Sequence, residues 1–143
     1  MGRILGIDYG SRRVGLAISD PLAITAQPYA AWRRTDEKDL ISRITALVRS
    51  ENVELVIVGF PLTLKGTKSP RSLATERFAG RLTDACTVPV LLWDERLTTV
   101  QAHRALHMMG KAPSRSRERV DVIAAAIMLQ SYLDGLSKIP TTE

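Results

Sequence analysis

Residues 6–20 read GIDYGSRRVGLAISD, and this stretch decides the fold. Arg3 to Tyr9 and Val14 to Ser19 are apolar runs that predict two strands. The joint between them, residues 10–13, has the composition of a short hairpin turn. Asp8 interrupts the first run close to its end, and two arginines follow in the turn. The stretch therefore predicts a hairpin that carries a carboxylate at the end of one strand.

Three further strands are predicted downstream. Ile24 to Ala31 predicts an edge strand, because Pro28 cannot donate a backbone hydrogen bond to a neighbour. Leu55 to Val58 and Val88 to Trp93 are continuous apolar runs. Such runs are typical of strands buried on both faces, as in a parallel sheet.

Helical spacing of apolar residues predicts four helices, separated by polar loops. They are a helix capped by Thr35 and ending near Ser50, a helix from Leu73 to Cys86, a helix from Thr98 or Thr99 to Gly110, and a helix from Val120 to Leu136. The last is apolar nearly all round, which predicts an interior position. Basic loops are expected from Leu62 to Ser72 and from Lys111 to Arg119. This order predicts an α/β fold with mixed strand directions, as one domain over residues 1–138 and a tail at 139–143.

The composition favours an anionic partner. The chain has 143 residues, with 20 Lys and Arg against 15 Asp and Glu, a formal net charge of +5. Nucleic acid is the commonest partner of such a surface. The single cysteine, Cys86, excludes an intrachain disulfide, and no apolar stretch is long enough to span a bilayer. We therefore expect a cytoplasmic protein with no membrane partner.

Four acidic residues follow or begin elements that converge in such a sheet. Asp8 ends the first strand, Asp94 and Glu95 follow the last, and Asp121 begins the final helix. Ligands collect outside the carboxyl ends of parallel strands, and clustered carboxylates need a cation such as Mg²⁺ or Mn²⁺. Paired metals can hydrolyse a phosphodiester. Each acid also has a structural interpretation, as a turn former, an ion-pair partner or a helix-dipole residue.

Polar and basic residues near these acids are candidates for contact with a nucleic-acid backbone. They are Ser11, Arg12, Arg13, Lys65, Lys68, Arg71, Arg96, Lys111, Arg115 and Arg117. The alternative for the hairpin arginines is that they are ordinary solvated charges.

Four motifs together resemble the YqgF/RuvX family of pre-16S rRNA nucleases and Holliday junction resolvases. They are GIDYGSRRVGLAISD at 6–20, IVGFP at 57–61, WDERLTT at 93–99 and VDVIAAAIMLQSYLD at 120–134, and the resemblance covers residues 3 to 135. Phe60 departs from the family's usual leucine. The resemblance implies a ribonuclease H-like α/β fold, with a five-stranded mixed sheet ordered 3-2-1-4-5 and helices on both faces.

The resemblance also implies a function. It implies a metal-dependent endonuclease that processes the 5′ end of pre-16S rRNA, with Asp8, Glu95 and Asp121 as catalytic residues and Asp94 beside Glu95 as a further metal ligand. One alternative is a resolvase acting on four-way DNA, which needs two active sites and hence a dimer. Another is a non-catalytic RNA-binding module. A third, an ATP-binding domain of the sugar kinase and actin-like type, needs two such domains. The expected partner is structured RNA or branched DNA, and the expected assembly is a monomer or weak homodimer.

Overall fold

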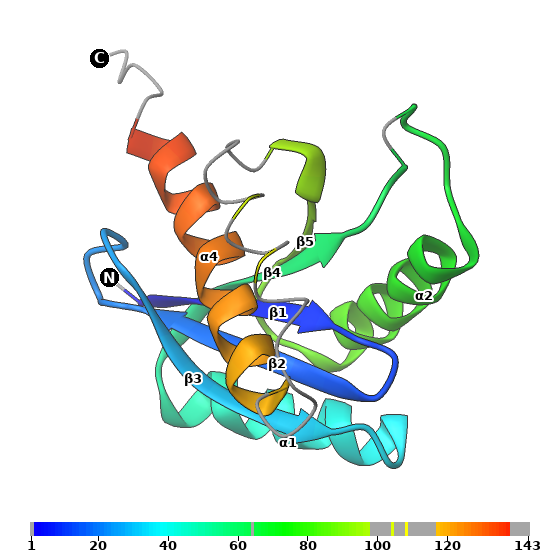
Figure 1. Cartoon of the computed structure of the whole chain (residues 1–143). Helices are drawn as coiled ribbons and strands as arrows, with labels where there is room; N and C mark the ends of the chain where they lie inside the picture. Colours follow the sequence, from blue (N-terminus) through cyan, green and yellow to red (C-terminus); the bar gives the residue numbers. More distant parts are fainter. Residues whose placement is uncertain (1, 64, 98–103, 105–107, 109–116, 138–143) are drawn as a thin grey trace.

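The computed structural model describes residues 2–63, 65–97, 104, 108 and 117–137, and its centre is one five-stranded sheet (Figure 1). The strands are β1 (Arg3–Tyr9), β2 (Arg13–Ser19), β3 (Ala26–Arg33), β4 (Val53–Phe60) and β5 (Val90–Asp94). Their order is β3-β2-β1-β4-β5. β1, β2 and β3 pair antiparallel, whereas β4 pairs parallel with both β1 and β5. The predicted order and mixture of directions are confirmed.

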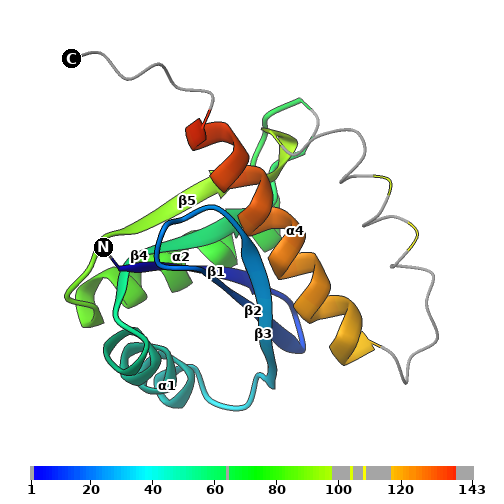
Figure 2. The same ribbon diagram turned by 90° about the vertical axis from the view of Figure 1, so that its left-hand side faces the viewer.

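Helices cover both faces of this sheet, as predicted (Figure 2). They are α1 (Glu37–Ser50), α2 (Pro70–Ala85) and α4 (Arg117–Ser137), and a short 3₁₀ turn, η1 (Glu95–Leu97), follows β5. α1 and α2 pack on one face, and α4 crosses the other (Figure 1). The side chains of β1 alternate between these faces, since successive residues of a strand point to opposite sides.

The core is therefore double. On the α1 and α2 face, Leu5, Ile7 and Phe78 belong to one cluster of buried apolar side chains. On the α4 face, Ile4 and Leu129 belong to a second cluster. Asp8 continues the row of Ile4 and Gly6 on β1, so its side chain is directed to the α4 face. The α4 face is thus the one that carries Asp8.

The position of α4 differs from the prediction of an interior helix. Ala125, Met128, Leu129 and Leu133 are buried against the sheet, while most of its other described side chains are only partly buried. Among the described residues, the apolar side of α4 makes its main contact with β1, β2 and β3.

Polar side chains account for the boundaries that were predicted wrongly. The cap of α1 is Asp36, one residue after Thr35, and its carboxylate accepts from the backbone N–H of Lys38. α2 begins at Pro70, three residues before Leu73, because Ser69 and Ser72 form a reciprocal capping box.

The start of β3 shifts from Ile24 to Ala26 for a similar reason. The carboxylate of Asp20 accepts hydrogen bonds from the backbone N–H groups of Leu22, Ile24 and Thr25. These bonds form a closed loop instead of a strand. The edge position predicted for this strand is confirmed, since β3 pairs only with β2 in the described sheet.

Some predicted elements lie outside the described residues. Of the predicted helix ending at Gly110, only Arg104 and Met108 are described. Most of the predicted loop 111–119 and all of the predicted tail 139–143 also lie outside the described residues. Among the described residues, no helix is long and apolar enough to cross a membrane.

Candidate active site

Asp8 lies in the middle of a row of three residues that cross the sheet, and both of its neighbours are glycines. Gly15 of β2 pairs directly with Asp8. On the other side, Ile7 pairs with Val58, so the next residue of β4, Gly59, lies beside Asp8. Glycine within a strand often marks the close approach of another group. Both glycines do so here, and they leave space on either side of the carboxylate.

Glu95 occupies the space over Gly59. β5 ends at Asp94, and the 3₁₀ turn η1 then directs Glu95 back over the sheet. A methyl group added to Gly59 would lie 2.7 Å from Oε1 of Glu95. The pKa of Glu95 is raised to about 7, first by burial and then by the negative charge of Asp8. Glu95 and Asp8 are therefore close enough to repel each other when both are ionised.

The pKa of Asp8 is also raised, mainly by burial, with the charge of Asp121 acting in the same direction and Arg71 opposing it. The Asp8 side chain keeps 23% of its exposure, so solvent and small ligands can reach it. Two carboxylates with raised pKa values at the end of parallel strands are typical of a functional site.

Asp121 approaches from the other side of the row, over Gly15. A methyl group on Gly15 would lie 2.2 Å from the backbone carbonyl oxygen of Asp121, so α4 packs directly on β2 at this point. The Asp121 carboxylate accepts from Nε of Arg13 at 2.7 Å. Arg13 therefore already compensates the charge of this acid.

Asp94 is compensated in the same way. Its two carboxylate oxygens accept from Nε and Nη2 of Arg96 at 2.6–3.0 Å, and the backbone N–H of Arg96 donates to it as well. These hydrogen bonds lower the pKa of Asp94. Asp94 thus stabilises the turn that positions Glu95.

The fit of these acids to a divalent cation is uneven. Within the described part of the chain, no three His, Cys, Asp or Glu side chains form a group that could hold a metal. Asp8 and Glu95 nevertheless offer carboxylate oxygens, the ligands that Mg²⁺ and Mn²⁺ prefer, and their mutual repulsion would fall on binding a cation. Asp121 would have to leave Arg13 to join them. Asp8 and Glu95 fit a cation directly, and Asp94 fits it least.

The predicted nucleic-acid contacts are spread around this edge. Ser11 and Arg12 lie exposed in the β1–β2 turn, and Lys65 is exposed in the loop after β4. Lys68 pairs with Glu76 at 2.8 Å. Arg117 begins α4, whereas Lys111 and Arg115 lie outside the described residues.

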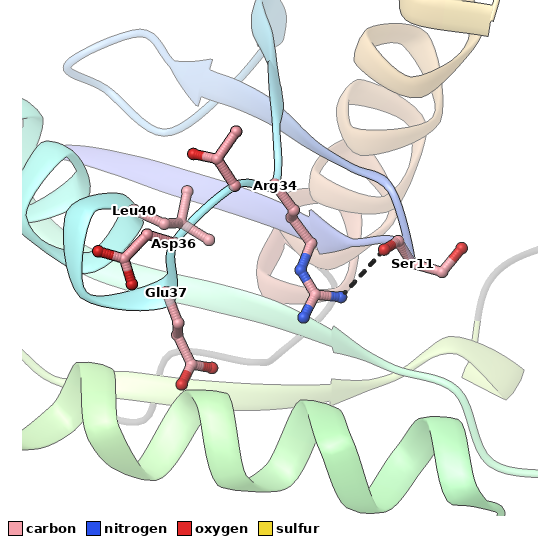
Figure 3. Close-up of a pocket in the computed structure, with 6 residues that line it drawn as sticks. Ser11, Arg34, Asp36, Glu37 and Leu40 are labelled. Atoms are coloured by element: carbon pink, nitrogen blue, oxygen red, sulfur yellow. Dashed lines mark hydrogen bonds between the residues drawn. The ribbon is translucent and has the colours of Figure 1, made fainter.

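A cavity of about 150 Å³ lies beside the β1–β2 turn (Figure 3), and its lining includes none of the four predicted acids. It is lined by Ser11, Arg34, Thr35, Asp36, Glu37 and Leu40. Arg34 crosses it, donates to the backbone carbonyls of Gly10 and Ser11, and covers the ring of Tyr9 at 4.1 Å. The residues that line the cavity therefore fix the hairpin and, through it, the end of β1.

The glycine row is what the sequence interpretation missed. Gly15 and Gly59 stand inside the quoted motifs GIDYGSRRVGLAISD and IVGFP. A glycine inside a strand pattern is itself a signal of close approach. Its partner, however, can be identified only when the strand register is known.

Comparison with known proteins identifies relatives over nearly the whole chain. Residues 2–135 match the sequence profile described as "RuvX: Holliday junction resolvase". A "Putative pre-16S rRNA nuclease" from Ruminiclostridium cellulolyticum is 40% identical over 136 residues, covering 94% of this chain and 96% of that protein. A protein of the same name from Acetivibrio thermocellus is 45% identical over 140 residues, covering 96% and 99%.

Two solved structures share the fold. One is the T. thermophilus RuvC in complex with a Holliday junction substrate, with a TM-score of 0.59, 15% identity and coverage of 96% of this chain and 98% of that one. The other is the fowlpox virus Holliday junction resolvase, with a TM-score of 0.52, 17% identity and coverage of 93% and 99%. At these identities the likeness concerns the fold, and it agrees with the predicted ribonuclease H-like sheet.

Proposed function

The chain belongs to the RuvX family, and on this premise we propose that it is a metal-dependent endonuclease that hydrolyses phosphodiesters in structured nucleic acid. The observation that carries the proposal is the pair formed by Asp8 and Glu95. Both have raised pKa values, and neither makes a hydrogen bond to a cationic side chain in the described residues. A partly buried pair of like charges is costly unless a ligand compensates it.

In the proposed reaction, Asp8 and Glu95 hold a divalent cation, Mg²⁺ or Mn²⁺, between β1 and η1. The cation, when bound, lowers the pKa of a water nucleophile and stabilises the leaving oxygen. Asp121 is paired with Arg13 and would have to leave it before it could act as a further ligand. Glycine at positions 15 and 59 keeps the carboxylates close together.

The proposed substrate is pre-16S rRNA, which the names of the relatives mention, and the family resemblance implies that its 5′ end is processed. The family description favours a second candidate, a four-way DNA junction. A resolvase of that kind cuts two strands symmetrically and so requires a dimer. A monomer or weak homodimer and a cytoplasmic location stay predictions.

The proposal can be tested with two labelled substrates, a pre-16S rRNA fragment with its 5′ extension and a synthetic four-way junction. We expect wild-type protein to cleave one of them only when Mg²⁺ or Mn²⁺ is present. Asp8→Asn should lower the rate by about 10³-fold or more, since it removes a preorganised charge at the reacting centre. A matched control is Asp84→Asn, which changes an exposed acid on α2.

Three outcomes are informative. RNA cleavage that requires Asp8 supports the rRNA nuclease, and paired cuts in the junction support the resolvase. RNA binding with no metal-dependent cleavage of either substrate would contradict the nuclease and favour the binding module. Salt sensitivity of binding does not separate these cases, because every phosphate-binding protein has it.

A further inference from the structure

The basic residues predicted to bind nucleic acid differ in whether their side chains already form ion pairs within this chain. Arg13, Lys68 and Arg96 each make a close ion pair with an acid of this chain. A guanidinium or ammonium group in such a pair has to leave its partner before it can bind phosphate. These three side chains therefore stabilise the folded chain and are less suited to capture substrate.

Arg71 behaves differently. Its Nη2 lies 3.9 Å from Oδ1 of Asp8, which is too long for a hydrogen bond. Its guanidinium makes no hydrogen bond to any group in the described residues, and 59% of the side chain is exposed. Its charge nevertheless lowers the pKa values of both Asp8 and Glu95. Arg71 is thus close to both acids, and its N–H donors are available.

The backbone of Arg71 is held firmly by hydrogen bonds, whereas its side chain makes only the longer ion pair with Asp8 in the described residues. It is the second residue of α2, between Pro70 and Ser72. Ser72 is fully buried and is bound to Ser69 through the capping box. The carbonyl of Arg71 accepts from the buried hydroxyl of Thr75 at 3.0 Å. The side chain therefore starts from a fixed point beyond the end of β4, close to the carboxyl edge of the sheet (Figure 1).

We propose that Arg71 is a catalytic residue that donates hydrogen bonds to a non-bridging oxygen of the scissile phosphate. This inference rests on the proposed nuclease function. A phosphate bound to a cation at Asp8 and Glu95 would lie within reach of Arg71, because the guanidinium already lies 3.9 Å from Asp8. The planar guanidinium can bind two phosphate oxygens at once and compensates the charge that grows on them during hydrolysis. No large rearrangement is needed, since only a weak contact to Asp8 is replaced.

The competing interpretation is that Arg71 only balances the charges of Asp8 and Glu95. That role would affect folding stability and would leave the chemical step unchanged once a metal ion is bound. The two roles can be separated by measuring the cleavage rate under single-turnover conditions apart from substrate affinity and thermal stability.

The test compares four proteins, wild type, Arg71→Ala, Arg71→Lys and the control Arg77→Ala, on whichever of the two substrates above the wild type cleaves. Arg77 lies on the same helix and is exposed. We expect Arg71→Ala to lower the single-turnover rate by about 10²-fold and to change the substrate Kd by less than about tenfold. Arg71→Lys should restore part of the rate, because it keeps the charge and loses the planar fork. Added guanidinium ion should also restore part of the rate of Arg71→Ala, but none of Asp8→Asn.

Two results would overturn the inference. One is an Arg71→Ala protein that cleaves within about threefold of wild type, and the other is a loss that matches a fall in melting temperature and does not respond to guanidinium. A wild-type protein with no metal-dependent cleavage is a different failure. It removes the proposed nuclease function, and the role of Arg71 falls with it.

Discussion

Two pairs of acidic side chains lie at the same edge of the sheet, and they differ in how their charge is compensated. Asp94 and Asp121 each accept a close hydrogen bond from an arginine, Arg96 and Arg13 respectively. Within the described residues, neither Asp8 nor Glu95 accepts such a hydrogen bond, and the pKa of each is raised. The first pair completes the fold, whereas the second is left with a charge that a ligand can compensate. We therefore propose that Asp8 and Glu95 act on the substrate and that Asp94 and Asp121 support them.

The largest expected effect is a difference in cleavage rate between substitutions of Glu95 and of Asp94. Glu95→Gln should lower cleavage by about 10³-fold, because the amide cannot replace a carboxylate beside a metal ion. Asp94→Asn should cost less than about tenfold, since it disturbs only the pair with Arg96. Rates measured under identical metal concentrations check this contrast. Equal losses in both variants would place Asp94 among the metal ligands as well.

A second prediction concerns stability and pH. Because the folded-state pKa of Glu95 is about 7 and its usual value is 4.5, the folded protein binds this proton more tightly than the unfolded chain. The resulting stabilisation is complete below pH 4.5 and is lost as the pH rises through about 7, by at most about 3 kcal/mol.

Glu95→Gln should therefore be more stable than wild type at pH 8 and similar to it at pH 4.5. Urea unfolding at the two pH values measures this difference. Added Mg²⁺ should raise the stability of wild type at pH 8 and leave Glu95→Gln nearly unchanged, since the ion binds only the native site. If wild type and Glu95→Gln have the same free energy of unfolding at both pH values, the inferred repulsion between Asp8 and Glu95 is wrong.

The two glycines provide a third test. An added methyl on Gly59 meets the end of the flexible Glu95 side chain, whereas one on Gly15 meets the backbone of Asp121. Gly59→Ala should therefore move the carboxylate and lower cleavage by about tenfold at nearly unchanged stability. Gly15→Ala should separate α4 from β2 and cost about 1–3 kcal/mol. Thermal unfolding and cleavage rates together measure the two effects, and a reversed order would mean that the close contacts are not as described.

The smallest effect is expected at the compensated pair of Arg13 and Asp121. Both side chains are partly exposed, so Arg13→Gln should cost about 1 kcal/mol or less. We expect Mg²⁺ to bind this variant at least as tightly as wild type, because Asp121 no longer has a competing cation. Calorimetric titration with Mg²⁺ measures the change. A clear weakening would show that Arg13 helps to form the site instead of competing for it.

The fold was largely predictable because its signals are local. The hairpin from Arg3 to Ser19 and the apolar run in β4 each show in a few consecutive residues. The four motifs then indicated the sheet order through the family resemblance. The predicted starts of α2 and β3 were wrong because the side chains of Ser69 and Asp20 bind nearby backbone N–H groups.

The site was predictable only as a set of acids. The positions of Asp8 and Glu95 could be predicted because both lie at strand ends. What distinguishes them from Asp94 and Asp121 is that the latter two pair with arginines. Asp94 pairs with Arg96, and Asp121 pairs with Arg13, which is 108 positions away in the sequence. Such pairing depends on the directions of the side chains, which cannot be predicted from the spacing of residues in the sequence. For the same reason the sequence does not distinguish Arg71, whose guanidinium lies beside Asp8, from the other basic residues.

The most direct test of the account is the location of a bound metal ion. Crystals soaked in Mn²⁺ should show one anomalous peak about 2.1 Å from carboxylate oxygens of both Asp8 and Glu95, and crystals of Asp8→Asn should lack it. A peak at Asp94 alone, or none between Asp8 and Glu95 at a Mn²⁺ concentration that supports cleavage, would contradict the account.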